Sequence, residues 1–208
     1  METPEFKTVG IVGAGAMGRG IAQIAAQAGS KVLLFDTQAD AVAKARESVA
    51  AQWDKLVEKG RIDAAAATAQ KERLQPAATL ADLAPCDLIV EAIVERLDVK
   101  KGLFAELEGI VQTTAVLATN TSSLSVTAIA AGLKRPQQFA GFHFFNPVPL
   151  MKVVECIAGL KTDPAVCKRL GMYARQMGHT PVQAEDTPGF IVNHAGRGYG
   201  TEALRIVS

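Results

Sequence analysis

A glycine turn near the N-terminus constrains the fold of this chain more than any other stretch. An apolar run at residues 9–12 leads into the pattern Gly13-x-Gly15-x-x-Gly18, and an apolar-periodic segment, residues 17–28, follows it. Gly13 permits a tight turn, Gly15 lets a pyrophosphate approach the backbone, and Gly18 lets a helix pack close to a sheet. A helix that begins here directs free N–H groups and the positive end of its dipole at a phosphate. The stretch therefore predicts a dinucleotide site formed by Gly13, Ala14, Gly15, Ala16, Met17 and Gly18.

A second apolar run narrows the choice of ligand. Residues 31–35, KVLLF, are suited to a buried parallel strand, and the run ends at Asp36, 18 residues after Gly18. An acid at this spacing accepts hydrogen bonds from the hydroxyls of an adenosine ribose and repels a 2′-phosphate. The alternative is that Asp36 only caps a turn before Gln38. Because strand, glycine turn, helix and second strand occur in the expected order, we predict NAD rather than NADP.

Composition and charge exclude several other classes of function. With 208 residues, 49% of them hydrophobic and 21% charged, the chain is typical of a soluble globular protein. Its net charge of +1 and the lack of a basic, aromatic-interleaved stripe give no support to nucleic-acid binding. The apolar runs are too short for a membrane span, and the first residues lack the apolar core of a signal peptide. We therefore expect a cytoplasmic enzyme.

The three cysteines do not suggest a metal site. Cys86, Cys156 and Cys167 are scattered, with no CxxC or histidine spacing typical of metal ligands. We expect them to be reduced thiols that pack as small apolar residues, and we predict no metal.

A long polar and apolar stretch, residues 39–79, separates the second strand from the next one. It is rich in Ala, Lys and Glu, and it predicts two helices, residues 39–59 and 63–72, with Gly60 at the junction. A simple crossover between parallel strands needs one helix, so the second predicted helix indicates a protruding helical hairpin at about residues 39–75. The pattern alone leaves two interpretations open, a substrate contact or an insertion without a role.

Strand-length runs then recur at residues 87–92, 115–119, 139–144, 152–157 and 181–184. Helical patterns separate several of them, at residues 97–108, 125–131 and 164–177. This alternation predicts an α/β fold with a Rossmann-type, doubly wound, mainly parallel sheet that helices cover on both faces. In such sheets, ligands bind beyond the carboxyl ends of the strands.

Polar residues gather at these predicted strand ends. They are Glu91, Glu95 and Lys100 after one strand, Asn120, Ser122 and Ser123 after the next, and His143 and Asn146 around a third. Such residues form binding sites, but hydroxyl and amide side chains also cap helices, so for each one alone both interpretations stay open.

His143 is the strongest candidate for a catalytic base among three histidines. It lies in the aromatic-rich sequence GFHFFNP, whereas we expect His179 in a surface turn and His194 as a packing or surface residue. A neutral histidine near an apolar pocket can take a proton from an alcohol. Glu155, 12 residues later, is placed to hydrogen-bond its far nitrogen and fix the tautomer. Without such support, a strand histidine is more often a core residue.

Five blocks of sequence together resemble the L-3-hydroxyacyl-CoA dehydrogenase family, which includes 3-hydroxybutyryl-CoA dehydrogenases. They are VGAGAMGRGIAQ, IVERLDVKK, ATNTSSLSV, GFHFFNPVPLMKVVE and DTPGFIVN, and they follow the family order over essentially the whole chain. The resemblance implies a Rossmann fold and the reversible, NAD-dependent oxidation of an L-3-hydroxyacyl-CoA to the 3-oxoacyl-CoA, a step of fatty-acid β-oxidation.

The resemblance also implies roles for single residues. His143 would be the general base, Glu155 its orienting partner, Ser122 a donor to the reacting oxygen, and Asn193 a residue that positions the substrate. Glu95, Lys100, Asn120, Ser122 and Asn146 would bind the cofactor together with the glycine turn and Asp36. In the hairpin, Ser48 and Lys55 would bind coenzyme A.

The chain departs from the family pattern after the block GFIVN. The family continues with a helical domain that supplies dimer contacts, so we expect residues 1–186 to be the NAD-binding domain and residues 187–208 the first helix of a truncated, all-α C-terminal domain. A homodimer is expected for the full-length protein. Gly196, Gly198 and Gly200 in that helix would each cost about 1 kcal/mol against alanine, so either close packing requires them or the helix is weak. Two alternatives remain, a β-hydroxyacid dehydrogenase whose substrate lacks coenzyme A, and a truncated NAD-binding module without turnover.

Overall fold

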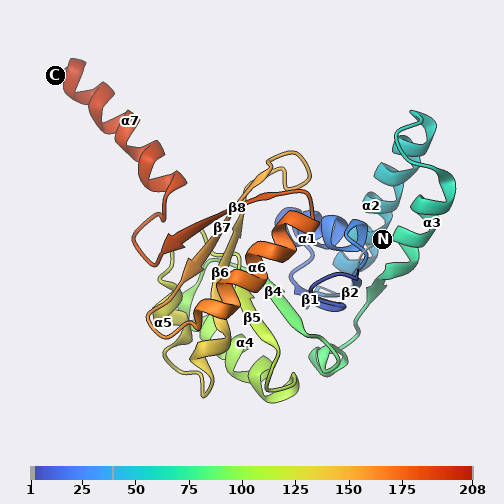
Figure 1. Ribbon diagram of the computed structural model, residues 1–208, viewed down its shortest axis with the longest axis horizontal. Helices are drawn as coiled ribbons and strands as arrows, with labels where there is room; N and C mark the ends of the chain where they lie inside the picture. Colours follow the sequence, from blue (N-terminus) through green and yellow to red (C-terminus); the bar gives the residue numbers. More distant parts are fainter. Residues whose placement is uncertain (1–2, 39, 208) are drawn as a thin grey trace.

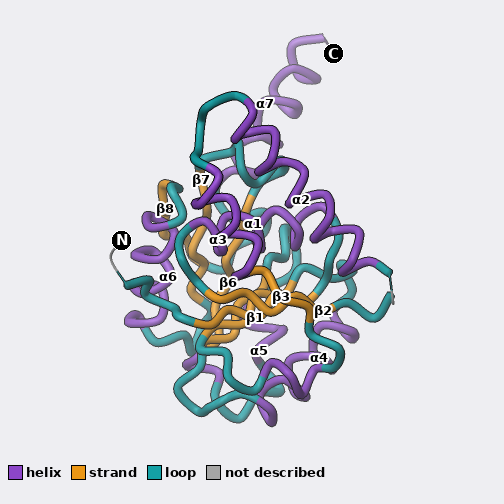
Figure 2. Tube along the Cα trace, turned by 90° about the vertical axis from the view of Figure 1, so that its right-hand side faces the viewer, coloured by secondary structure: helices purple, strands orange, loops and turns teal. Residues whose placement is uncertain are grey.

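The computed structural model describes residues 3–38 and 40–207, which form one eight-stranded sheet with helices on both faces (Figures 1 and 2). The strands are β1 (Thr8–Val12), β2 (Lys31–Phe35), β3 (Leu74–Pro76), β4 (Leu88–Glu91), β5 (Val116–Thr119), β6 (Phe139–Phe144), β7 (Val153–Ala158) and β8 (Thr180–Glu185). The helices are α1 (Ala16–Gln27), α2 (Ala41–Glu58), α3 (Ala64–Arg73), α4 (Leu97–Ile110), α5 (Val126–Ala130), α6 (Pro164–Gln176) and α7 (Val192–Val207), with short 3-10 helices at Leu80–Leu83 and Pro136–Gln138.

The strand order is β3-β2-β1-β4-β5-β6-β7-β8. The sheet is parallel from β3 to β6, whereas β7 pairs with β6 antiparallel and with β8 parallel. The first six positions have the doubly wound order in which the chain reverses between β1 and β4, and ligands bind outside the carboxyl ends of the strands at that reversal. The predicted α/β, mainly parallel fold is confirmed.

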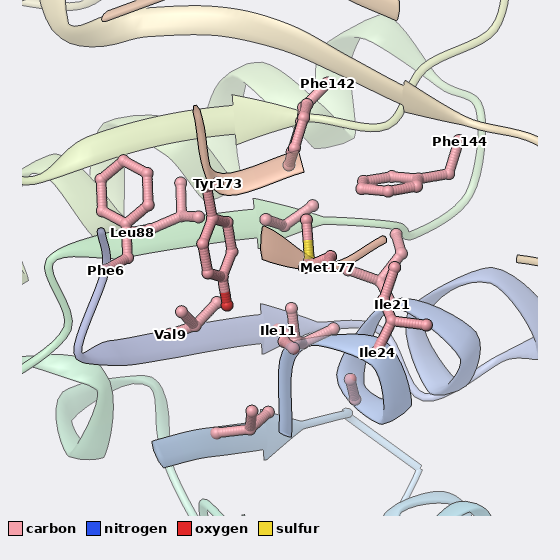
Figure 3. Close-up of a cluster of buried hydrophobic side chains, with 14 of the residues drawn as sticks. Phe6, Val9, Ile11, Ile21, Ile24, Leu88, Phe142, Phe144, Tyr173 and Met177 are labelled. Carbon is pink, nitrogen blue, oxygen red and sulfur yellow. The ribbon is translucent and has the colours of Figure 1, made fainter. Parts of the chain in front are cut away.

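Two apolar cores lie on the two faces of the sheet, because successive strand side chains point to opposite sides. Leu88 and Val90 of β4 pack in the core under α1, α2 and α6, whereas Ile89 between them packs under α4 and α5. Figure 3 shows part of the first core, where Ile21 and Ile24 of α1 meet side chains from β1, β4 and β6. Helices on both faces leave the carboxyl edge of the strands as the open side of the sheet.

The predicted helical hairpin is present as α2 and α3, which lie beside α1 at one side of the molecule (Figure 1). The predicted start of the hairpin at residue 39, like the predicted domain limits at residues 1 and 208, lies outside the described residues. The short strand β3 was not predicted. Its three residues, Leu74–Pro76, end in a proline, and they pair only with the edge of β2.

The last helix, α7, begins at Val192, five residues later than predicted, and projects away from the body (Figure 1). An added Cβ at Gly196, Gly198 or Gly200 meets no described atom within 4 Å, so close packing does not require these glycines in this part of the chain. The domain boundary at residue 186 falls between β8 and α7 and stays a prediction.

The expectation for His179 is wrong, whereas that for His194 is correct. His179 is buried, and its Nδ1 and Nε2 lie 3.1 Å and 3.0 Å from the carbonyl oxygens of Met177 and Val148. The Val148 carbonyl and the Phe144 ring of β6 contact His179 from distant parts of the sequence, which a local sequence pattern does not reveal. His194 is exposed.

Candidate active site

The glycine turn joins β1 to α1 at the point where the strand order reverses. Gly13 has a φ of 103°, and an added Cβ there would lie 2.5 Å from the carbonyl oxygen of Ala92. An added Cβ at Gly18 would lie 1.8 Å from the carbonyl oxygen of Gly13, whereas one at Gly15 would meet nothing within 4 Å. Two glycines are therefore required by the fold, and the third borders open space at the N-terminus of α1. This arrangement fits a bound pyrophosphate.

Asp36 closes the turn from the end of β2. Its carboxylate accepts hydrogen bonds from the backbone N–H groups of Ala14 (2.7 Å) and Gln38 (2.8 Å). Asp36 therefore does cap this turn, as the alternative interpretation predicted. Each carboxylate oxygen accepts more than one hydrogen bond, so ribose hydroxyls can still be bound. Beside Asp36 lies a cavity of about 300 Å³ with mostly apolar walls, among them Val12, Phe35 and Leu80, which suits an adenine ring.

A cleft of about 440 Å³ lies on the other side of the turn. Its walls come from the ends of β4, β5 and β6, from α1 and α4, and from the start of α7. The cleft brings together eight of the predicted site residues, namely Met17, Glu95, Lys100, Asn120, Ser122, His143, Asn146 and Asn193.

His143 and Glu155 form a buried dyad on the antiparallel strands β6 and β7, where they are register partners. His143 Nδ1 lies 2.7 Å from Glu155 Oε2, and the two residues are 4% and 0% exposed. An ionised carboxylate only accepts hydrogen bonds, so Nδ1 carries the proton and the Nε2 lone pair is left basic. Nε2 has no hydrogen-bond partner among the described residues, and His143 lines the cleft. The rings of Phe145 and Phe190 lie beside the imidazole.

Glu95 fixes the loop that follows β5. Its Oε1 accepts hydrogen bonds from the Thr121 hydroxyl (2.5 Å), the Ser122 N–H (3.0 Å), and the N–H and hydroxyl of Ser123. Burial raises the pKa of Glu95, but the hydrogen bonds from Thr121 and Ser122 and the charge of Lys100 outweigh it, so the pKa lies below its ordinary value. Glu95 is therefore ionised at neutral pH and holds the Ser122 backbone at the cleft.

Lys100 is a buried cation between two carboxylates. Its Nζ lies 2.5 Å from Glu91 Oε1 and 3.2 Å from Glu95 Oε2, and Lys100 and Glu91 are 1% and 0% exposed. Glu91 also accepts hydrogen bonds from the Ile93 N–H and the Thr119 hydroxyl. The ion pair thus joins the end of β4 to α4 and Glu95, and a single negative charge remains at this wall of the cleft.

Three asparagines complete the cleft. The Asn120 side-chain oxygen accepts a hydrogen bond from the Phe144 N–H (2.8 Å), which ties β5 to the end of β6. Asn146 precedes a cis peptide bond to Pro147. Asn193, in the first turn of α7, donates to the Ser122 carbonyl at 3.3 Å. The start of α7 and the loop after β5 therefore meet across the cleft.

The two residues predicted to bind coenzyme A, Ser48 and Lys55, lie on α2 and do not line this cleft. A second cavity of about 210 Å³ shares Asn146 with the cleft and reaches α2 at Gln52. Ser48 and Lys55 lie one turn from Gln52 along the same helix face. The sequence pattern did not single out Gln52, because helical spacing alone does not tell which residue of a face borders a cavity.

That second cavity also contains polar side chains from α1. Arg19 and Gln23 line it, and Gln23 is 4% exposed. Among the described residues, neither side chain has a hydrogen-bond partner. The only sequence feature that could have indicated a role for Arg19 and Gln23 is their position directly after the glycine turn.

The cysteines are reduced and buried. Burial raises the pKa of Cys86 and Cys156 to about 12 and that of Cys167 to about 11, so all three are protonated at neutral pH. Within residues 3–38 and 40–207, no three His, Cys, Asp or Glu side chains are arranged to hold a metal ion. No helix in this part of the chain is long and apolar enough to span a membrane.

The fold and the glycine turn define a Rossmann-type dinucleotide-binding domain. The family described as "3-hydroxyacyl-CoA dehydrogenase, NAD binding domain" matches residues 8–187, and the chain belongs to it. NAD is thus the cofactor, as predicted.

Relatives and a solved structure agree with this family. The chain is 44% identical to a 3-hydroxyadipyl-CoA dehydrogenase of Escherichia coli, over 96% of this chain and 42% of the relative. It is 41% identical to a probable 3-hydroxybutyryl-CoA dehydrogenase of Deinococcus radiodurans, over 95% of this chain and 71% of the relative. A crystal structure of a 3-hydroxybutyryl-CoA dehydrogenase from Escherichia coli superposes with a TM-score of 0.94 at 44% identity, over 97% of this chain and 43% of the other. The chain thus spans less than half the length of some relatives.

Proposed function

We propose that this chain provides the NAD-binding domain and the catalytic base of an enzyme that interconverts L-3-hydroxyacyl-CoA and 3-oxoacyl-CoA. The observation that carries the proposal is the buried His143–Glu155 dyad, which borders a cleft next to the glycine turn. The family and the names of the relatives support a coenzyme A thioester as the substrate.

In the oxidation, the 3-hydroxyl proton moves to His143 Nε2 while the C3 hydrogen leaves as hydride. NAD⁺, when bound, supplies the hydride acceptor. Glu155 holds the Nδ1–H tautomer and offsets the positive charge that forms on the imidazole. Ser122 and Asn193 can donate hydrogen bonds to the substrate oxygen as negative charge develops on it. The reduction follows the same steps in reverse.

The binding residues divide between two ends of the site. The glycine turn and Asp36 would hold the pyrophosphate and the adenosine ribose, and Glu95, Lys100, Asn120 and Asn146 would surround the nicotinamide and the thioester. Lys55, with Ser48, would contact coenzyme A on α2, and Gln52 extends that set toward the cleft. The homodimer and the cytoplasmic location stay predictions.

The test is NADH consumption with acetoacetyl-CoA, with free acetoacetate as the control substrate. We expect turnover of the thioester only. His143→Gln should lower kcat about a hundredfold or more and leave NADH affinity nearly unchanged, which is the usual result of losing a general base. His194→Gln, which changes an exposed histidine, is the matched control and should keep wild-type turnover. Unchanged kcat in His143→Gln would rule out this mechanism, and equal turnover of free acetoacetate would rule out the thioester.

A further inference from the structure

The carboxylate of Glu155 has a second set of partners besides His143. Its Oε1 accepts hydrogen bonds from the backbone N–H groups of Ile191 and Val192, both at 2.9 Å. Val192 is the first residue of α7 and Ile191 directly precedes it, and N–H groups at the start of a helix have no intrahelical acceptors. The same carboxylate therefore orients the imidazole with one oxygen and caps α7 with the other.

A buried carboxylate needs these donors. Glu155 is 0% exposed, and a charge out of water is stable only where hydrogen bonds replace its hydration. His143 supplies one N–H, and Ile191 and Val192 supply two more, together with the positive end of the α7 dipole. The start of α7 thus keeps the charge of Glu155 in place opposite the imidazole.

An unusual backbone conformation at Phe190 directs the two N–H groups toward Glu155. Phe190 has a φ of 50°, the only positive φ of a non-glycine among the described residues, and it follows Gly189 with a φ of 78°. A side chain in this left-handed region is strained, and such strain persists only where the surroundings hold it. Phe190 is 4% exposed, and its ring centroid lies 5.7 Å from that of His143.

The chain is also fixed just before this turn. Asp186 accepts hydrogen bonds from the Ser125 hydroxyl and from the N–H groups of Val126 and Thr127 at the start of α5. The segment between β8 and α7 is therefore anchored at α5 on one side and at Glu155 on the other. It has little freedom to relax the strained residue between the two anchors.

We propose that Phe190 is a positioning residue for the catalytic dyad. Its buried ring holds a strained backbone that directs the Ile191 and Val192 N–H groups at Glu155, and Glu155 in turn fixes His143. This inference rests on the proposed function, because it assigns Phe190 to the reaction through His143.

Two substitutions separate the backbone role from the effect of the ring. Phe190→Ala and Phe190→Gly both remove the ring, but only glycine adopts a positive φ without strain. If Phe190 acts through the backbone, the glycine variant keeps Ile191 and Val192 at Glu155 and the alanine variant does not. In the full protein, we expect Phe190→Ala to lower kcat by about a hundredfold and Phe190→Gly by only about tenfold, with KM for NADH unchanged in both.

Amide hydrogen exchange provides a readout that does not depend on turnover. The Ile191 and Val192 amides should be protected in the wild type and in Phe190→Gly, and should exchange about tenfold faster in Phe190→Ala. A kcat of Phe190→Gly equal to or lower than that of Phe190→Ala would overturn the proposal, because the ring would then act only through its own contacts and not through the backbone. Unprotected amides in the wild type would also overturn it, even if the alanine variant does not fold. A wild type without turnover would instead contradict the proposed function.

Discussion

Removing the buried cation Lys100 should destabilise the domain through the carboxylate that it leaves behind. In Lys100→Met, Glu91 would stay 0% exposed and keep only its hydrogen bonds from Ile93 and Thr119. An uncompensated buried charge costs about 3–5 kcal/mol, and the two remaining donors place this case at about 3 kcal/mol. Since the free energy of unfolding falls by about 2 kcal/mol per molar urea, the urea concentration at the unfolding midpoint should fall by about 1.5 M.

A double-mutant cycle tests the cause of this loss. In Lys100→Met with Glu91→Gln, the buried charge is gone, the amide oxygen can accept from the Ile93 N–H, and the amide NH2 can donate to the Thr119 hydroxyl oxygen, so about 2 kcal/mol should return. The exposed pair Lys44 and Asp40 is the control, and its coupling energy should stay below about 0.5 kcal/mol.

Urea unfolding without cofactor is followed by fluorescence of Trp53, the single tryptophan, which is 0% exposed, and by circular dichroism. Strictly additive losses, with a coupling energy for Lys100 and Glu91 under about 0.5 kcal/mol, would refute the reasoning. The pair would then be solvated in solution despite its burial.

Two further predictions concern carboxylates at the ends of the strands. Asp36→Ala should weaken NADH binding about tenfold or more, because hydrogen bonds to a charged acceptor are lost, and should reduce the preference for NADH over NADPH. Fluorescence titration of both cofactors measures these affinities. Unchanged selectivity would mean that Asp36 only caps the turn. Burial raises the pKa of Asp186, but hydrogen bonds from Ser125, Thr127 and Val126 outweigh it and hold the pKa below the ordinary value of 3.8. The stabilisation from Asp186 is therefore present above about pH 4 and lost as pH falls through the lower, folded-state pKa. Asp186→Asn should cost about 1 kcal/mol at neutral pH and progressively less below pH 4 in urea unfolding, and a cost that is independent of pH would contradict this.

The order of strands and helices could be predicted because each element has its own local signal. The run KVLLF coincides with β2, and the predicted hairpin differs from α2 and α3 by one or two residues at most of its ends. The strand β3 had no such signal, because it has three residues and a proline and depends on its partner β2. The start of α7 was placed too early for a related reason, since the turn at residues 189–190 depends on contacts with β6 and β7.

The candidate site was predictable only in part. The residues at the carboxyl ends of β4, β5 and β6 converge on one cleft, as parallel strands require. Pairing of His143 with Glu155 follows from the antiparallel register of β6 and β7, which 12 residues of spacing permit but do not determine. The roles of Glu91 and Phe190 were not visible, because one depends on burial and the other on a backbone angle.

The choice between a cap and a binding residue, left open by the sequence, turns out not to be exclusive at this sheet edge. Asp36, Glu95 and Glu155 each accept backbone N–H groups, and each also lies at a cavity or beside a side chain that borders one. The backbone hydrogen bonds fix the position of each carboxylate before any ligand arrives. A charged group that is already fixed loses little entropy on binding and needs little reorganisation during the reaction. Backbone capping and ligand binding are therefore linked here, because the backbone hydrogen bonds that fix these loops also orient the carboxylates toward the ligand.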